Sequence, residues 1–145
     1  MTTTKTILGY TVRDAEVQSK EPVDSAEKAL PFLEDYRARD REHLIALFLN
    51  ARQQVIAVDV ISVGTLTASL VHPREFFKGA IMFNAAAVIM AHNHNSGDPT
   101  PSQEDKDTTK RMIKAGELLG IPFLDHVIIT PAKGVYFSFR EAGLI

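Results

Sequence analysis

The chain has 145 residues, 45% of them hydrophobic, which is enough to build the core of one domain of ordinary size. Its 16 Lys and Arg against 18 Asp and Glu give a formal net charge of −2, without a basic run. This balance does not support nucleic acid as a partner, which would then need a local basic face. The chain contains no cysteine, and this excludes disulfides, thiolate metal sites and a cysteine nucleophile.

No stretch of the sequence indicates a membrane protein or a secreted one. The longest apolar stretches, such as residues 44–49 and 85–91, are far too short to cross a bilayer. The N-terminal sequence MTTTKTILGY lacks the hydrophobic segment of a secretory signal. We therefore expect a soluble, cytoplasmic protein that makes no contact with a membrane. The sequence does not indicate its oligomeric state.

The first part of the chain is expected to form an arm followed by a helix. Residues 1–22 are mixed and polar, with a short strand expected at residues 7–12, and we place the main domain at residues 23–145. Asp24 or Ser25 offers an N-cap for the helix, because short polar side chains accept hydrogen bonds from the first free backbone N–H groups. Pro31 removes a backbone donor and should kink or restart that helix.

Three strands are expected next. The apolar run HLIALFLN, which begins at His43, predicts a buried strand. Alternation over residues 55–63 predicts a second strand. Gly64 ends it, and residues 65–71 are expected to form a third strand.

Helices and strands alternate over the rest of the chain. Pro73 at a first helical position predicts a helix to about residue 84, and the apolar run 85–91 predicts a strand covered on both faces. Ser102 is expected to cap a long helix that ends at Gly120, and two strands should finish the chain. The order predicts an α/β fold with a mixed β-sheet flanked by helices. The remaining expectations are an inner helix face of Thr108, Met112, Ala115 and Leu119, strands at 121–130 and 135–138, and a last turn at 140–142.

The segment HNHNSGDPTPSQED carries the strongest functional signal. It places His92, His94, Ser102 and Asp105 in the pattern H-x-H-x7-S-x2-D. On a strand, the two histidines point to the same face because they are two residues apart. Two imidazoles and a carboxylate suit Zn²⁺, and three protein ligands leave a fourth tetrahedral position open for water, as in catalytic sites.

Ordinary structural roles compete with this interpretation. Ser102 and Asp105 also fit a helix capping box, although the third helical position there is usually Glu or Gln. The two histidines near a loop rich in Gly and Pro can simply be solvated. The complete pattern is more specific than either half, and one serine can both cap a helix and present its hydroxyl to a site.

Hydrolysis at a metal-activated water also needs a base, which takes a proton from the water and passes it to the leaving group. The candidate carboxylates are Glu42, Glu75 and Glu104. Asp125-His126 offers a further pair, interpreted either as a structural pair or as a support for a metal ligand. We expect Asn93, between the two histidines, to point the other way and to be structural.

The pattern H-x-H-x7-S-x2-D resembles the JAMM (MPN+/JAB) metalloprotease motif. The stretches VHPREFFKGAI, NAAAVIMAHNHNSGDPTPSQED, LGIPFLDHVII and SFREAGLI resemble the bacterial RadC family, from about Glu42 to the C-terminus. One departure is Asn95, which stands where the family usually has Pro, and we expect it to alter the loop without loss of the metal. Many RadC proteins also carry an N-terminal helix-hairpin-helix segment, for which 145 residues leave no room.

The resemblance implies the α/β/α sandwich of JAMM domains, similar to that of cytidine deaminases. It further implies Zn²⁺ bound by His92, His94 and Asp105, with Glu42 as the general base. Ser102 would donate a hydrogen bond to the substrate carbonyl oxygen as that oxygen gains charge. The activity implied is a zinc metallopeptidase that cleaves a peptide or isopeptide bond in a peptide or protein of unknown identity.

Two other functions compete with hydrolysis of a peptide bond. One is a non-catalytic metal-binding module of DNA-repair or mobile-element biology, in which the metal only holds the loop. The other is a metal-dependent nuclease, although nuclease HNH sites use residues dispersed over a ββα unit. Zinc deaminase chemistry is excluded because it requires a P-C-x-x-C motif and the chain has no cysteine.

Overall fold

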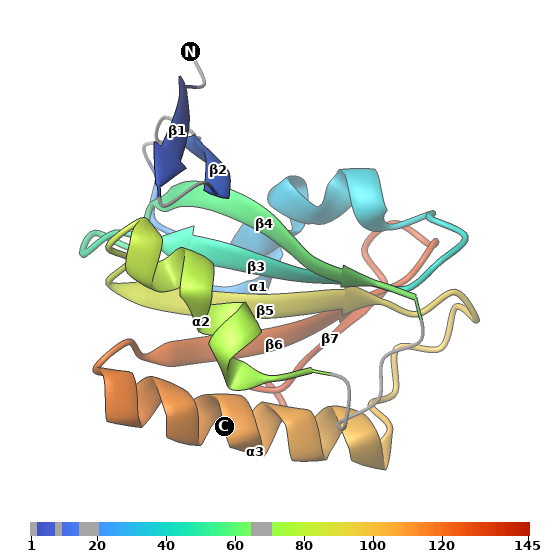
Figure 1. The fold of residues 1–145 in the computed structure, drawn as a ribbon. Helices are drawn as coiled ribbons and strands as arrows, with labels where there is room; N and C mark the ends of the chain where they lie inside the picture. Colours follow the sequence, from blue (N-terminus) through green and yellow to red (C-terminus); the bar gives the residue numbers. More distant parts are fainter. Residues whose placement is uncertain (1–2, 8–9, 15–20, 65–70) are drawn as a thin grey trace.

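The computed structural model describes residues 3–7, 10–14, 21–64 and 71–145 (Figure 1). Within them, one five-stranded sheet has the order β4-β3-β5-β6-β7. Only β5 and β6 are parallel, and the other neighbours pair antiparallel. The sheet is therefore mixed, as the sequence predicts. Its strands are β3 (His43–Leu49), β4 (Val55–Val63), β5 (Ala87–Asn93), β6 (Phe123–Ile129) and β7 (Tyr136–Ser138).

Helices cover both faces of this sheet. One face packs on α2 (Pro73–Met82) and α3 (Gln103–Leu119), whose Phe76, Phe77 and Met112 share a core cluster with alternate residues of β3 and β5. The opposite face packs on α1 (Ala26–Ala29) and the 3-10 helix η1 (Leu30–Tyr36), which lie behind the sheet in Figure 1. The predicted α/β fold, a mixed sheet flanked by helices, is confirmed. No helix of the described residues is long and apolar enough to cross a membrane.

The start of the chain follows the sequence in part. Ser25 caps α1 by accepting a hydrogen bond from the Lys28 N–H, and the chain changes to a 3-10 helix with Pro31 at its start. The single strand expected at residues 7–12 is wrong. The described residues of that stretch belong to two strands, β1 (Thr3–Ile7) and β2 (Tyr10–Asp14), which pair antiparallel. The strand expected at 65–71 falls on residues 65–70, which lie outside the described residues.

Helix α3 crosses from β5 to β6, and its two ends are set by the residues that the sequence indicates. Ser102 caps its N-terminus, and Gly120 ends it in a left-handed conformation with φ of 72°. The prediction that Leu119 lies on the inner face of this helix is wrong, because Leu119 is 46% exposed. The chain turns back after Gly120, so that the Ile121 N–H donates to the Gly116 carbonyl and Ile121 joins the core instead.

Candidate metal centre

The two histidines of the motif lie at the C-terminal end of β5. His92 is the sixth residue of the strand and pairs with Leu44 of β3. His94 follows the strand, and its N–H still donates to the Ile129 carbonyl of β6. Their Nε2 atoms are 2.8 Å apart, so both imidazoles face the same point, as the two-residue spacing predicts.

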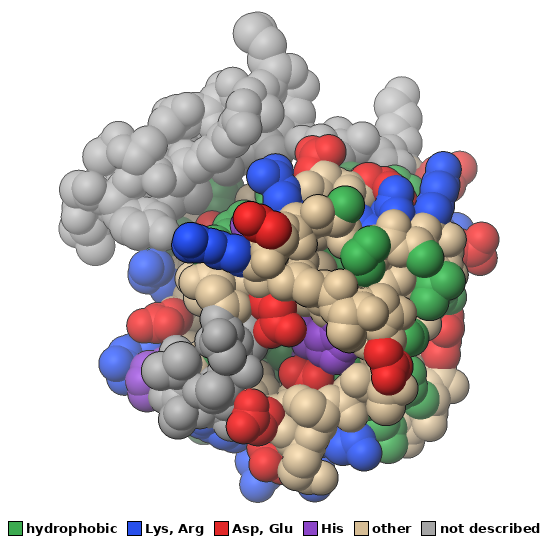
Figure 2. All heavy atoms as spheres, turned by 90° about the vertical axis from the view of Figure 1, so that its right-hand side faces the viewer, with side chains coloured by type: hydrophobic (Ala, Val, Ile, Leu, Met, Phe, Trp, Pro, Cys, Tyr) green, Lys and Arg blue, Asp and Glu red, His purple; other side chains and the backbone are tan. Residues whose placement is uncertain are grey.

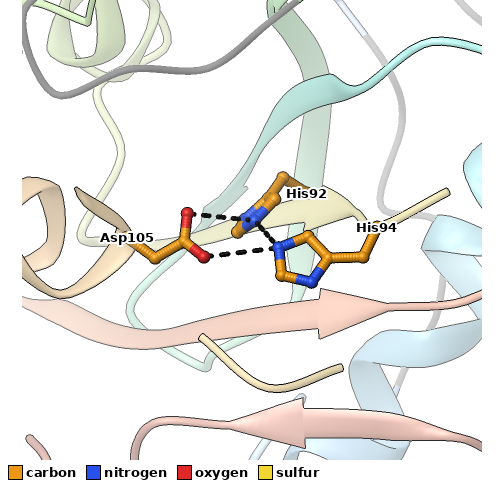
Figure 3. Close-up of side chains that lie close together, drawn as sticks. All are labelled: His92, His94 and Asp105. Carbon is orange, nitrogen blue, oxygen red and sulfur yellow. Dashed lines mark hydrogen bonds and ion pairs between the residues drawn. The ribbon is translucent and has the colours of Figure 1, made fainter. Parts of the chain in front are cut away.

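Asp105 reaches the same point from the first turn of α3. Its Oδ1 lies 3.3 Å from Nε2 of His92, and its Oδ2 lies 3.3 Å from Nε2 of His94 (Figure 3). The capping box is present: the Asp105 N–H donates to Oγ of Ser102, and the Ser102 N–H donates to Oδ2 of Asp105. The cap and the metal interpretation are therefore compatible, since the cap fixes the carboxylate between the imidazoles.

The Asp105 carboxylate interacts electrostatically with the two imidazoles beside it. Burial alone would raise the pKa of the Asp105 carboxyl group, but hydrogen bonds with His92 and His94 outweigh it and hold that pKa well below its usual range. The hydrogen bond with Asp105 in turn raises the pKa of His94. Figure 2 shows histidine side chains in a hollow of this face with acidic side chains around them. A buried carboxylate between two imidazoles is an arrangement that suits a cation.

The outer ring nitrogens of the two histidines have fixed partners. Nδ1 of His94 lies 2.8 Å from the Asp98 carbonyl, which can only accept, so Nδ1 carries a proton and Nε2 has a lone pair when the ring is neutral. Nδ1 of His92 lies 2.7 Å from Nε2 of His126. Together, His92, His94 and Asp105 offer three ligand atoms within 4.8 Å of one another and can hold a metal ion.

Glu42 is placed beside the metal ligands by the register of the sheet. Leu44 of β3 pairs with His92 of β5, and continuing this antiparallel register by two residues brings Glu42 opposite His94. The negative charge of Glu42 contributes to the raised pKa of His94. Glu42 also lines an open hollow of about 400 Å³ with Asp40, Arg41, Gly64 and Asn95.

Two asparagines of the motif hold the segment that carries Glu42. Asn93 is fully buried and points away from the metal ligands, as expected, to accept from the His43 N–H at 2.6 Å and donate to the Arg41 carbonyl at 2.9 Å. Asn95 donates to the Asp40 carbonyl at 2.8 Å and accepts from the Asn93 amide at 3.2 Å. The segment before β3 is thus tied on both sides of Glu42 to the metal-ligand loop.

The other candidate carboxylates lie elsewhere. Glu75 is in α2 and lines a separate depression with Asp59 and Lys78. Glu104 is exposed in the first turn of α3. Of the three candidate bases, Glu42 is therefore the one whose charge acts on a histidine of the motif, His94.

Asp125 and His126 point to opposite faces of β6 and do different things. Asp125 faces the side of α1, where it accepts from Oγ of Ser138 at 2.6 Å and from the N–H groups of Arg140 at 3.0 Å and His126 at 2.8 Å. His126 faces the side of α3 and contacts His92. Asp125 thus has a structural role, whereas His126 contacts a candidate metal ligand. The sequence does not show which residue of the pair has which role.

We expect Asp125→Ala to lower the free energy of unfolding by about 2–4 kcal/mol, because it leaves three donors without an acceptor. Burial raises the pKa of the Asp125 carboxyl group, so its charge is not favoured there. Asp125→Asn keeps one acceptor oxygen and should cost less than half as much. Urea unfolding of both variants measures the difference, and equal losses would contradict the account.

Thr109 of α3 is a polar residue that sequence reasoning misses. It is 1% exposed, and its Oγ1 lies 2.6 Å from Nδ1 of His126. A lone threonine inside an amphipathic helix carries no pattern that would mark it. Its partner His126 lies on a strand 17 residues later, and only the packing of α3 on β6 brings them together.

Fold and site together define an α/β domain with a candidate metal centre where a central strand ends, the usual place for a binding site in such sheets. A family model described as a RadC-like JAB domain matches residues 23–144. The chain therefore belongs to the RadC-like JAB family.

The chain is similar to bacterial proteins named UPF0758. A UPF0758 protein of Desulforamulus reducens is 56% identical over 113 residues, which cover 78% of this chain and 49% of the relative. A UPF0758 protein of Symbiobacterium thermophilum is 57% identical over 104 residues, covering 72% of this chain and 44% of the relative. The chain thus spans about half the length of the curated relatives that it matches.

Proposed function

We propose that this protein is a zinc-dependent hydrolase of the JAMM type that cleaves a peptide or isopeptide bond. The observation that carries the proposal is the convergence of His92, His94 and Asp105, with the negative charge of Glu42 acting on His94. A structural metal site needs no additional carboxylate at its open side. A hydrolase needs one as a base.

The ligand set suits zinc. Tetrahedral ligands about 2.0–2.1 Å from a zinc ion lie about 3.3 Å from one another. Oδ1 of Asp105 lies at this distance from Nε2 of His92, and Oδ2 lies at this distance from Nε2 of His94, so either oxygen matches the spacing to one histidine. The two Nε2 atoms at 2.8 Å need to separate by about half an ångström. Two neutral imidazoles and one carboxylate are zinc ligands of catalytic sites, and zinc bound by them would activate a water molecule for attack on a carbonyl group.

The residues of this chain would supply the remaining steps. Glu42 would accept a proton from the attacking water and deliver it to the leaving amine. The hydroxyl of Ser102 accepts from the Asp105 N–H, which leaves its hydrogen free to donate to a carbonyl oxygen that gains charge. Such a donor is worth about 3 kcal/mol in the transition state.

An open hollow beside Glu42 could receive part of a substrate. It has a volume of about 400 Å³ and is lined mainly by polar and charged residues, but by none of the three metal ligands. A peptide segment or the side chain of a protein can enter such a hollow more readily than a small apolar ligand, which prefers an enclosed apolar pocket.

The test combines metal content with hydrolysis. Protein purified without a His tag or chelator should contain about one zinc per chain by elemental analysis. It should cleave members of a fluorogenic peptide and isopeptide library, lose this activity when a chelator removes the metal, and regain it with zinc.

Three results would contradict the proposal. Folded protein that binds no zinc when it is supplied would reject the metal centre. Zinc-loaded protein that cleaves no peptide but cuts plasmid DNA with added Mg²⁺ or Mn²⁺ would point to a nuclease, and one that does neither would point to a binding module.

A further inference from the structure

A line of buried hydrogen bonds leads from the metal ligand His92 into helix α3. Nδ1 of His92 lies 2.7 Å from Nε2 of His126, and Nδ1 of His126 lies 2.6 Å from Oγ1 of Thr109. The Thr109 hydroxyl donates to the Asp105 carbonyl at 2.8 Å. His92, His126 and Thr109 are each 1% exposed, so water does not readily replace a missing partner.

The proton positions along this line depend on one another. A carbonyl oxygen only accepts, so the Thr109 hydrogen is used toward Asp105 and Oγ1 of Thr109 accepts from Nδ1–H of His126. Nε2 of His126 then bears a lone pair and accepts from Nδ1–H of His92. In the neutral ring this leaves the lone pair of His92 on Nε2, the atom that faces Asp105 and His94 and that a metal ion would use.

The ring of His126 is held in the orientation that this line requires. It stacks on Phe139 with ring centroids 4.6 Å apart and an angle of 12° between the planes. The Phe139 N–H also donates to the His126 carbonyl at 3.0 Å, which fixes the two residues relative to each other. The His126 ring is therefore held with its Nε2 atom toward Nδ1 of His92.

We propose that Thr109 and His126 are positioning residues that set the tautomer of His92 and so determine the metal affinity of the site. The inference rests on the proposed metal binding and deepens it. Partners of this kind behind a metal-bound histidine typically change metal affinity by about 10–100-fold. Asp105 then contributes twice, with its carboxylate as a ligand and its carbonyl as the end of the line.

The hydrogen bonds of this line can also be donated in the opposite direction, from His126 to His92. A substitution that removes the Thr109 hydroxyl should favour that arrangement. With Val at position 109, Nδ1 of His126 has no hydrogen-bond partner in either tautomer, so no acceptor holds the proton of His126 on Nδ1 any longer. The proton can then lie on Nε2 of His126 and be donated to Nδ1 of His92. The proton of His92 then lies on Nε2, where it faces Asp105 and blocks metal binding.

The experiment compares Thr109→Val, which keeps the branched shape but replaces the hydroxyl by a methyl group, with Thr109→Ser, which keeps the hydroxyl and lacks the methyl group. Zinc affinity is measured by competition with a chromophoric chelator at fixed pH. We expect a loss of about 10-fold or more for Thr109→Val and less than about threefold for Thr109→Ser. Urea unfolding of the metal-free variants checks that both are folded.

A second measurement does not depend on any variant. Long-range ¹H–¹⁵N NMR of the zinc-loaded wild-type protein should show the proton of both His92 and His126 on Nδ1. A proton on Nε2 of His126, or wild-type zinc affinity in Thr109→Val, overturns this inference alone. Failure of the wild-type protein to bind zinc overturns the proposed function and this inference with it.

Discussion

The Glu42→Gln variant is expected to bind zinc as tightly as the wild-type protein and to hydrolyse its peptide substrate at least about 100-fold more slowly. Glutamine keeps the size and shape of the side chain but cannot take a proton from water. Glu42 is not one of the three ligands, so the metal should stay in place. Zinc content and turnover of the same preparation test both halves of the prediction.

Glu104→Gln is the matched control for this experiment. It makes the same chemical change in the first turn of α3, one residue before the ligand Asp105, at an exposed position. It should keep both zinc and turnover within about threefold, since single surface substitutions usually have small effects. Glu42→Gln with turnover like that of Glu104→Gln would show that another group is the base.

Periodic and strongly apolar parts of the fold could be predicted from the sequence. The alternation over Val55–Val63 corresponds to a strand with those bounds, and the run HLIALFLN corresponds to β3 except for its last residue, Asn50. The arm at the N-terminus was predicted as one strand because its pattern is weak and no Gly-Asn type turn marks the hairpin. Leu119 was misplaced because helical periodicity cannot show where the following chain turns back over the helix.

The predictability of the site depends on distance along the chain. His92, His94, Ser102 and Asp105 lie within one short segment, where strand and cap geometry alone bring their side chains together. Glu42 lies 50 residues before His92 and was assigned through the family resemblance, because the register of β3 and β5 is not readable from composition.

The partners of the ligands are harder still to predict. Thr109 and His126 meet only through the packing of α3 on β6. The sequence marks Asp125-His126 as a pair with two possible roles, but it does not mark Thr109. Asn93 was expected to be structural, but its connection to the segment of Glu42 also required the three-dimensional arrangement.

The largest loss of metal is expected for Asp105→Asn, because Asp105 serves as a ligand and as part of the helix cap. Asparagine can keep the acceptor for the Ser102 N–H, but it places an amide nitrogen near Nε2 of His92 in place of Oδ1. That amide is neutral and would donate to the lone pair that the metal needs. Zinc affinity should fall by more than about 100-fold, beyond the usual cost of a residue behind a ligand.

Asp105→Ala and Ser102→Ala separate the two roles of Asp105. Both remove part of the capping box and should lower the free energy of unfolding of the metal-free protein by about 1 kcal/mol. Asp105→Ala should also lose zinc, whereas Ser102→Ala should keep zinc and lose turnover. Chelator competition and urea unfolding of the three variants therefore give three different patterns. If the zinc affinity of Asp105→Asn were within tenfold of that of the wild-type protein, the Asp105 carboxylate would not be a zinc ligand. Its role would then be limited to the helix cap.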